Sequence, residues 1–333
     1  MPWKGEPDPY KIWVSEIILQ QTQVAQGIAY YHRFITKYPT VQDLASAKDH
    51  EVFKIWEGLG YYSRCKNMLT SARLIMGEMN NNFPTTYKEL LLLPGVGSYT
   101  ASAIASFAYN LPHAVLDGNV FRVLSRFFGI ESPIDSSSGK KVFTELADSL
   151  LDKSNARMYN QAIMDFGATV CRPLPLCPSC PLNKKCIAYL NSLTTHLPVK
   201  GKQLVRKERW MYFLVIEYQG KVYVRRRNVK DIWQNLYEFV LVENSQPVSL
   251  ETLRLRTFFS HVFGDKPFCI NNISPVQRQL LTHQVISGRF IAISLKNPLS
   301  YLDYELVSKN QLRKLPFPKY ITTYLDKINV SLK

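Results

Sequence analysis

The chain has 333 residues, of which 46% are hydrophobic and 20% are charged. This length and composition predict about two folded domains and exclude a wholly disordered chain. The 41 Lys and Arg residues outnumber the 26 Asp and Glu residues, and the net charge of +15 favours a polyanionic partner such as DNA, RNA or an anionic membrane surface.

The first half of the chain has a helical pattern. Apolar residues recur every three or four positions, and Pro or Gly residues separate the segments. The pattern predicts helices over 10–34, 52–79, 87–93, 98–109, 120–128 and 140–151, with no convincing strand before residue 171. No apolar run approaches the ~20 residues of a membrane span, and the N-terminus has no apolar signal core. We therefore expect neither a membrane protein nor a secreted one.

The first predicted helix carries an acidic residue among apolar ones. Glu16 has Ile12, Trp13 and Leu19 one helical turn away. Such surroundings would raise the pKa of the Glu16 carboxyl and suit it to general acid catalysis near neutrality. Residues 20–23 include three glutamines, whose amides suit base edges. From these residues alone, a helix-surface carboxylate and solvated glutamines are the simpler interpretation.

A glycine-containing turn separates the predicted helices 87–93 and 98–109. Gly95, Val96 and Gly97 form a short connection that lets the backbone bend tightly and approach another molecule. The following helix presents free N–H groups at its start, where an anion is favoured. This arrangement predicts a helix–hairpin–helix that binds a DNA phosphate without reading sequence, whereas the alternative is a plain interhelical turn.

A second acidic residue stands immediately before the helix predicted at 120–128. Asp117 and Asn119 are most simply an Asp-Gly turn and a helix N-cap. The functional alternative is a carboxylate directed into a cleft. Together with Glu16 it would form the acid-plus-carboxylate pair that glycosidic bond cleavage requires.

Four of the six cysteines lie within sixteen residues. They are Cys171, Cys177, Cys180 and Cys186, with a C-x5-C-x2-C-x5-C spacing. Clustered thiols in a large chain predict a metal site in a reducing compartment, not a disulfide framework. Both a [4Fe–4S] cluster and a structural zinc are compatible, and the presence of only one C-x-x-C favours iron–sulfur.

After about residue 190 the composition changes. Residues 190–209 are predicted to form a basic linker. Strands are predicted over 211–218, 221–227, 237–242 and 284–295, and helices over 249–259 and near 307–315. Residues 210–333 are therefore expected to form an α+β domain.

Taken in order, these stretches resemble the adenine DNA glycosylase (MutY) family of the helix–hairpin–helix DNA glycosylase superfamily. The resemblance rests on the cysteine cluster and on PYKIWVSEIILQQTQV, GLGYYSRCKN, LPGVGSYTASAIASFAY, VLDGNVFRVLSR and IWQNLYEF. It implies a multidomain fold of α and α+β domains. An all-helical glycosylase domain with a [4Fe–4S] cluster would occupy 1–189, the linker 190–209, and a Nudix-like domain 210–333.

The resemblance implies that the chain removes adenine mispaired with 8-oxoguanine or guanine in double-stranded DNA, after flipping the base out of the duplex. Glu16 would protonate adenine N7, Asp117 would stabilise the oxocarbenium-like sugar, and Tyr99 and Asn119 would position these groups. Endonuclease III carries a lysine nucleophile where this chain has Tyr99, which implies a monofunctional glycosylase. We expect a monomer in the bacterial cytoplasm, at the nucleoid.

The resemblance also implies DNA contacts. Those that probe the duplex near the lesion would be Gln21, Thr22, Leu59 and Tyr61, and the hairpin would contribute Gly95, Val96 and Gly97. The family reads 8-oxoguanine with a Phe-Ser-His motif that opens a strand. Residues 259–261 have these letters, but Thr282 and His283 precede the alternating strand at 284–295, so we assign recognition to Thr282 and His283.

Particular residues disfavour the alternative functions, and others depart from the family pattern. An endonuclease III-type enzyme for oxidised pyrimidines is disfavoured by Tyr99 and by the second domain. A non-catalytic DNA-binding protein with a structural metal is disfavoured by Glu16 and Asp117. The first cysteine spacing is five residues where the family usually has six, and Lys4 stands where the family often places arginine.

Overall fold

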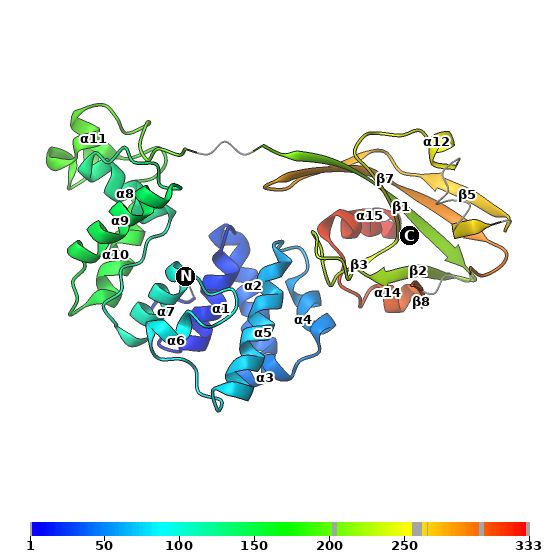
Figure 1. Ribbon diagram of the computed structural model, residues 1–333, viewed down its shortest axis with the longest axis horizontal. Coiled ribbons are helices and arrows are strands. Elements are labelled where there is room, and N and C mark those ends of the chain that lie inside the picture. The colour runs from blue at the N-terminus through cyan, green and yellow to red at the C-terminus, as the bar shows by residue number, and fades with distance from the viewer. Residues whose placement is uncertain (1, 202–204, 255–261, 265, 300–302, 331–333) are drawn as a thin grey trace. The chain divides into compact units, whose positions relative to one another are not determined.

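The computed structural model describes residues 2–201, 205–254, 262–264, 266–299 and 303–330 (Figure 1). The chain forms two compact units. The first contains Met1–Ser46 and Asn67–Gln203, and the second contains Ala47–Lys66 and Leu204–Lys333. This division differs from the predicted continuous domain over 1–189, because residues 47–66 group with the C-terminal part of the chain.

The first unit is helical, as predicted. Its helices are α1 (Pro9–Leu19), α2 (Val24–Lys37), α3 (Val41–Ser46), most of α5 (Tyr62–Glu78), α6 (Tyr87–Leu90), α7 (Ser98–Tyr109), α8 (Gly118–Phe128), α9 (Ser137–Leu150), α10 (Ala156–Thr169) and α11 (Ile187–Leu190). The cysteine segment adds two short 3-10 turns, η1 (Cys177–Ser179) and η2 (Asn183–Lys185). No helix among the described residues has the length and apolar character needed to cross a membrane.

Two of the predicted helices are each two helices in the structure. The helix predicted over 10–34 breaks after Leu19, where Gln21 adopts a φ of 54°. The helix predicted over 52–79 separates into α4 (Asp49–Trp56) and α5, and the connection contains Gly58 and Gly60 with φ of 90° and 79°. A left-handed backbone conformation is incompatible with a continuing helix, and period counting cannot detect it when the flanking apolar residues stay in phase.

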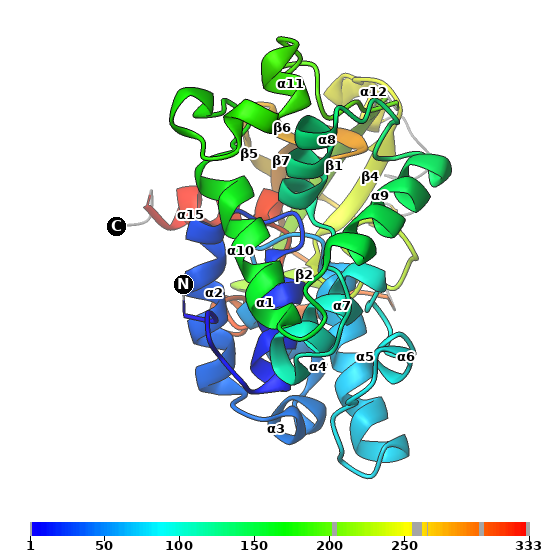
Figure 2. The same ribbon diagram turned by 90° about the vertical axis from the view of Figure 1, so that its left-hand side faces the viewer.

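Buried apolar side chains position the helices of the first unit. Helix α7 packs against both α1 and α10, and α8 packs against α10 (Figure 2). Trp13 and Leu44 are fully buried, and each such side chain contributes about 1.5–3 kcal/mol through burial. The buried Asn160 on α10 donates to Ser106 Oγ (2.8 Å) and to the His113 carbonyl (2.9 Å), which ties α10 to α7. The ends of these helices are thereby held in fixed positions.

Over its described residues, the second unit contains an eight-stranded mixed sheet. Its strands are β1 (Lys207–Tyr218), β2 (Lys221–Arg226), β3 (Tyr237–Glu238), β4 (Val240–Asn244), β5 (Phe268–Ile273), β6 (Gln277–Leu280), β7 (Gln284–Leu295) and β8 (Glu305–Ser308). The long strands β1 and β7 are parallel neighbours, and the other pairings are antiparallel. The predicted strands correspond to β1, β2 and β7, and the run predicted over 237–242 corresponds to β3 and β4; β5, β6 and β8 were not predicted.

The helices of the second unit also differ from the prediction. The helix expected near 307–315 is β8 followed by the single turn α14 (Lys309–Leu312). Of the helix expected over 249–259, α12 (Leu250–Arg254) is present, and the remainder lies outside the described residues. Helix α15 (Lys319–Val330) was not predicted.

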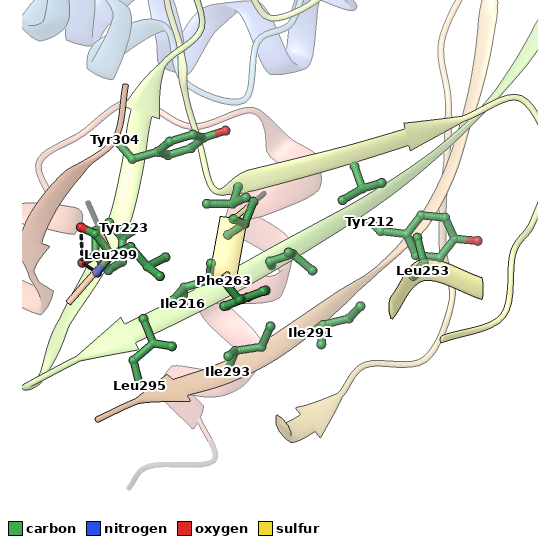
Figure 3. Close-up of a cluster of buried hydrophobic side chains, with 14 residues drawn as sticks. Tyr212, Ile216, Tyr223, Leu253, Phe263, Ile291, Ile293, Leu295, Leu299 and Tyr304 are labelled. Atoms are coloured by element: carbon green, nitrogen blue, oxygen red, sulfur yellow. Dashed lines mark hydrogen bonds between the residues drawn. The ribbon is translucent and has the colours of Figure 1, made fainter. Parts of the chain in front are cut away.

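Apolar clusters cover both faces of the sheet. On one face, Phe213 and Phe290 pack with Phe317, Tyr320 and other residues of the α15 segment. On the other face, side chains of β1, β2, β4 and β7 pack with Leu253 of α12 and with Phe263 (Figure 3). Because both faces are buried, β1 contains a continuous apolar run over residues 210–216, and neighbouring residues of β7, such as Phe290 and Ile291, pack on opposite faces.

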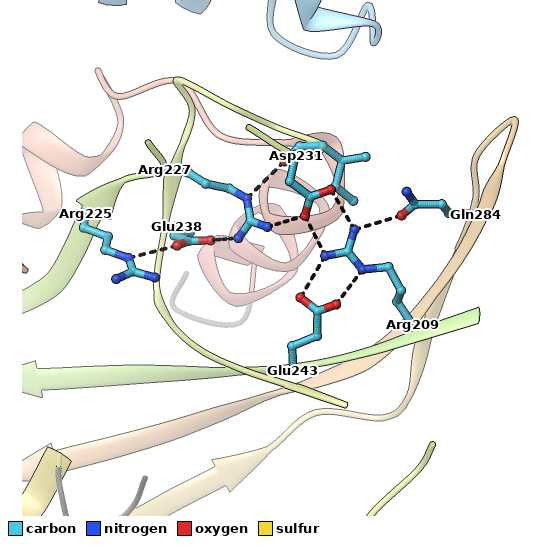
Figure 4. A network of polar contacts seen from close by, with 8 residues as sticks. Arg209, Arg225, Arg227, Asp231, Glu238, Glu243 and Gln284 are labelled. Atoms are coloured by element: carbon cyan, nitrogen blue, oxygen red, sulfur yellow. Dashed lines mark hydrogen bonds and ion pairs between the residues drawn. The ribbon is translucent and has the colours of Figure 1, made fainter. Parts of the chain in front are cut away.

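An ionic network fixes the segment between β2 and β3 (Figure 4). Asp231 accepts hydrogen bonds from Arg209 (2.6 Å) and Arg227 (2.7 Å). Arg209 also pairs with Glu243 at 2.6 Å, and Arg227 with Glu238 at 2.7 Å. Arg227 and Glu238 are buried, so removing one partner would leave an uncompensated charge at a cost of about 3–5 kcal/mol. The segment is therefore held firmly against the sheet.

Candidate active site

A cavity of about 800 Å³ opens in the first unit, where α1, α7, α8 and α10 converge. The four residues predicted as catalytic all line it, namely Glu16, Tyr99, Asp117 and Asn119. They come from three helices that are far apart in sequence. The packing of α1, α7 and α8 thus brings together groups that the sequence alone could not pair.

Glu16 lies on α1, a helix that is almost entirely buried. Asp8 caps its N-terminus by accepting the Tyr10 N–H at 2.9 Å, and Pro9 occupies its first position. Glu16 is 6% exposed, and burial raises the pKa of its carboxyl to about 7. This value includes a lowering of the pKa by the hydrogen bond from Tyr99 and a smaller increase caused by the charge of Asp117. Glu16 is therefore partly protonated at neutral pH and is suited to act as a general acid.

Tyr99 holds the Glu16 carboxyl in position. It lies in the first turn of α7, and its hydroxyl donates a hydrogen bond to Glu16 Oε2 at 2.8 Å. Burial and the nearby carboxylates keep the pKa of Tyr99 well above its ordinary value. The Tyr99 phenol therefore stays protonated and acts as a hydrogen-bond donor, which fixes the orientation of the Glu16 carboxyl.

Asp117 has a different environment from Glu16. It is the N-cap of α8, accepting the Val120 N–H at 2.7 Å and the Asn119 Nδ2 at 2.7 Å. Burial raises the pKa of Asp117, but these hydrogen bonds oppose the shift by stabilising the charged form. The two carboxyls therefore have different surroundings, since Glu16 accepts a hydrogen bond from a phenol and Asp117 accepts from a main-chain N–H and a side-chain amide.

Arg122 holds the Asn119 side chain in position through a hydrogen bond. Its Nη2 donates to Asn119 Oδ1 at 2.8 Å and to the Gly167 carbonyl at 2.9 Å, and its Nε donates to the Cys171 carbonyl at 2.7 Å. A Cβ on Gly167 would lie 2.7 Å from that of Asn119, so glycine is needed for this approach of α10 to α8. The cysteine segment and the Asp117 end of α8 are therefore connected through one side chain.

Sequence reasoning missed the contribution of α10. Gln161 and Asp165 of this helix line the cavity, and Asp165 pairs with Lys4 at 2.6 Å. No helix was predicted between 151 and 171, although Tyr159, Ile163 and Phe166 recur at spacings of four and three residues and could have indicated it.

The predicted hairpin is present between α6 and α7. Gly95 has a φ of 81°, and a Cβ there would lie 2.8 Å from Asn67 Cβ. Gly97 caps α7 without a side-chain hydrogen bond, and both glycines are exposed, whereas the Val96 side chain is buried. The exposed backbone at the start of α7 suits a phosphate contact, and any contribution of Val96 would come from its main chain.

The other residues predicted to contact DNA lie in different places. Gln21 is exposed at the break between α1 and α2, with Thr22 half-buried beside it, and both line the cavity. Leu59 and Tyr61 belong to the second unit, where Tyr61 is 42% exposed but Leu59 is only 6% exposed. That the Leu59 side chain probes DNA stays a prediction, and in this structure the side chain is buried.

Thr282 and His283 precede β7 in the second unit. The Thr282 hydroxyl contacts that of Tyr61, and the His283 carbonyl accepts the Lys207 N–H at 3.0 Å. The competing motif at 259–261 lies outside the described residues.

Cys171, Cys177, Cys180 and Cys186 line a second, small cavity in the first unit. Burial and the other three thiols raise the pKa of Cys177, and Arg126 Nη1 lies 3.6 Å from Cys171 Sγ. Arg126 is buried and also donates to the Arg172 carbonyl at 2.7 Å. Within the described ranges, no three His, Cys, Asp or Glu residues are grouped closely enough to hold a single metal ion.

Comparisons with known proteins agree with this geometry. The family model for HhH-GPD superfamily base excision DNA repair proteins matches residues 14–149. The adenine DNA glycosylase of Buchnera aphidicola subsp. Schizaphis graminum (strain Sg) is 38% identical over 240 residues, covering 72% of this chain and 69% of that protein. That of Buchnera aphidicola subsp. Acyrthosiphon pisum (strain APS) is 33% identical and covers 82% of this chain and 81% of its own length.

Two solved structures are similar to part of this chain. A thermostable thymine-DNA glycosylase is similar with a TM-score of 0.53 and 32% identity, covering 57% of this chain and 88% of that chain. A non-covalent endonuclease III–DNA complex is similar with a TM-score of 0.50 and 25% identity, covering 56% of this chain and 86% of that chain. With the Glu16 and Asp117 pair in its cavity, the chain belongs to the adenine DNA glycosylase family of HhH-GPD base excision DNA repair proteins, which are hydrolases of N-glycosyl bonds.

Proposed function

We propose that the chain excises adenine paired with 8-oxoguanine or guanine in double-stranded DNA and leaves an unbroken abasic strand, acting as a monomer in the bacterial cytoplasm. The observation that carries the proposal is the buried carboxyl of Glu16, with a pKa raised to about 7, held by Tyr99 in a cavity shared with Asp117. An N-glycosyl bond to a neutral purine breaks readily only when the base leaves protonated, and Glu16 supplies that proton.

The reaction begins when adenine leaves the base stack and enters the cavity, because the bond is inaccessible inside the duplex. Glu16 donates its proton to N7, and the electrons of the C1′–N9 bond move to the base as the bond breaks. The carboxylate of Asp117 stabilises the positive charge on the sugar, and Asn119 holds Asp117 in position. Water then adds to C1′ and gives its proton to the Glu16 carboxylate, which yields the abasic site and restores the acid.

Tyr99 supports a glycosylase without strand-nicking activity. A lyase needs an amine nucleophile that forms a Schiff base with the sugar. The Tyr99 hydroxyl has no such chemistry and is engaged with Glu16 at 2.8 Å.

Recognition of 8-oxoguanine is assigned to the second unit, which we propose to be a Nudix-like module without nucleotide hydrolysis, since the sequence has no Nudix signature of clustered glutamates. The contact between the hydroxyls of Thr282 and Tyr61 supports the choice of Thr282 and His283. This contact joins Tyr61, which the resemblance places near the lesion, to Thr282, which the resemblance implies in the recognition of 8-oxoguanine.

The four cysteines are proposed to hold a [4Fe–4S] cluster. All four line one cavity, and the buried Arg126 offers a positive charge to Cys171. The bound cluster would supply a structural link across the cysteine segment, not a chemical step. Native protein is expected to be brown, with absorbance near 400 nm and about four iron atoms per chain; a colourless, zinc-loaded protein would contradict this.

The pKa of Glu16 predicts how the reaction depends on pH. Only the protonated carboxyl donates a proton, so the rate of adenine release should fall as pH rises through about 7. Well above this pKa the loss is about tenfold per pH unit, and single-turnover rates between about pH 5.5 and pH 9 measure it. Because the hydrogen bond from Tyr99 lowers the pKa of Glu16, Tyr99→Phe should move the falling limb to higher pH. If the falling limb of the pH–rate profile were at the same pH in Tyr99→Phe as in the wild type, a group other than Glu16 would control it.

Single-turnover assays on matched duplexes test the function itself. One duplex carries a single A·8-oxoguanine pair, a second carries A·T, and a third carries an oxidised pyrimidine. We expect adenine release from the first only, with strand breakage only after alkali. Release from the third would identify an endonuclease III-type enzyme, and tight mispair binding without any release would indicate a non-catalytic binding protein.

A further inference from the structure

The helical hairpin of residues 47–66 is anchored to the sheet of the second unit through its α4–α5 turn. Lys54 Nζ donates to the Leu315 carbonyl at 3.0 Å. Glu57 Oε1 accepts the Phe317 N–H at 2.8 Å. The Leu315 carbonyl and the Phe317 N–H are both main-chain groups of the segment that precedes α15, so the hairpin is bonded to the backbone of this segment.

Glu57 is the centre of this contact. Its other carboxylate oxygen accepts from Lys54 Nζ at 2.8 Å, and its side chain is 19% exposed. One carboxylate therefore joins a cation of α4 to a main-chain amide more than 250 residues later. The partial burial reduces screening by solvent, so this pair is stronger than an ordinary surface ion pair.

The turn that follows Glu57 is rigid and ends at Tyr61. Trp56 Nε1 and Arg64 Nη2 each donate to the Gly60 carbonyl at 3.1 Å. Tyr62 accepts the Gly58 N–H at 3.1 Å. Tyr61 has a φ of 47°, a conformation that a tyrosine adopts only when its surroundings enforce it. A displacement of Glu57 would therefore be transmitted to Tyr61.

The α15 segment is in turn connected to the strands that carry Thr282. Phe317 and Tyr320 belong to the apolar cluster that contains Phe290 of β7. The Tyr320 hydroxyl donates to the Gln277 carbonyl of β6 at 3.0 Å. Thr282 lies between β6 and β7, so both ends of the contact between Tyr61 and Thr282 are fixed to the same framework.

We infer that Glu57 is a positioning residue for lesion recognition. By fixing the α4–α5 turn to the backbone before α15, it holds Tyr61 against Thr282, so that the two side chains meet the base opposite adenine as one surface. This inference rests on the proposed reading of 8-oxoguanine by the second unit.

The test compares Glu57→Ala with Glu51→Ala in the full chain. Glu51 is an exposed glutamate on the same helix and is the matched control. The readout is the ratio of adenine release rates from A·8-oxoguanine and A·G duplexes at sub-saturating enzyme. We expect Glu57→Ala to lower this ratio by at least about 10-fold, since small misplacements of a recognising group have effects of this size. Glu51→Ala should leave the ratio unchanged.

Lys54→Met keeps the inference testable if Glu57→Ala folds poorly. It removes the cation of the same contact but keeps the acceptor for Phe317, and should also lower the ratio. The effects of Lys54→Met and Glu57→Ala should not add in the double variant, because both act through one contact. General destabilisation would lower both rates together and leave the ratio unchanged, which overturns the inference. A wild-type protein with no preference for 8-oxoguanine would instead overturn the proposed function.

Discussion

Glu16→Gln is expected to lower the single-turnover rate of adenine release by about 10³-fold while changing DNA affinity little. The amide occupies the same volume and still accepts the hydrogen bond from Tyr99, but it has no acidic proton to give to the base. Glu16 is buried inside the cavity, where it makes no contact suited to a DNA phosphate.

Two measurements separate this effect from a loss of structure. Equilibrium binding to a duplex that contains A·8-oxoguanine should be retained, and the unfolding temperature should not fall, because a buried carboxyl with a raised pKa is replaced by a neutral group. Glu145→Gln on the exposed surface of α9 is the control for the chemical change alone. An equal loss of binding and turnover in Glu16→Gln would mean that Glu16 serves folding or docking instead of proton transfer.

Asp117→Asn is expected to reduce the rate of adenine release by about 10²-fold to 10³-fold, because a neutral amide no longer offsets the charge that develops on the sugar. Asparagine is as good an N-cap as aspartate, so helix α8 should keep its cap at Val120. The variant therefore keeps the cap at Val120 while it removes the negative charge and the oxygen that accepts from Asn119 Nδ2.

Asp117→Ala provides the comparison. It removes both charge and cap and should be less stable than Asp117→Asn by about 1 kcal/mol, measured by denaturant unfolding. The two variants should be similarly slow. If Asp117→Asn released adenine at the wild-type rate and only Asp117→Ala were impaired, Asp117 would be a cap and nothing more.

Local sequence was sufficient wherever neighbouring residues decide the structure. Helix α7 and strand β7 have the predicted bounds of 98–109 and 284–295, because apolar periodicity, glycine and β-branched residues act over a few positions. It was insufficient where a single dihedral angle interrupts a periodic run, as at Gln21 and Gly58. The predicted helices 10–34 and 52–79 were wrong for this reason.

The site shows the same division. The sequence by itself determined a helical chain with a hairpin turn, a cysteine cluster and two carboxylates, each of which had an ordinary structural explanation. Tertiary structure alone decided that Glu16 is buried and hydrogen-bonded to Tyr99, that Asp117 shares its cavity, and that residues 47–66 belong with the sheet. The physical reason is that burial and the pKa it shifts depend on helices brought together from positions about a hundred residues apart, which no local pattern records.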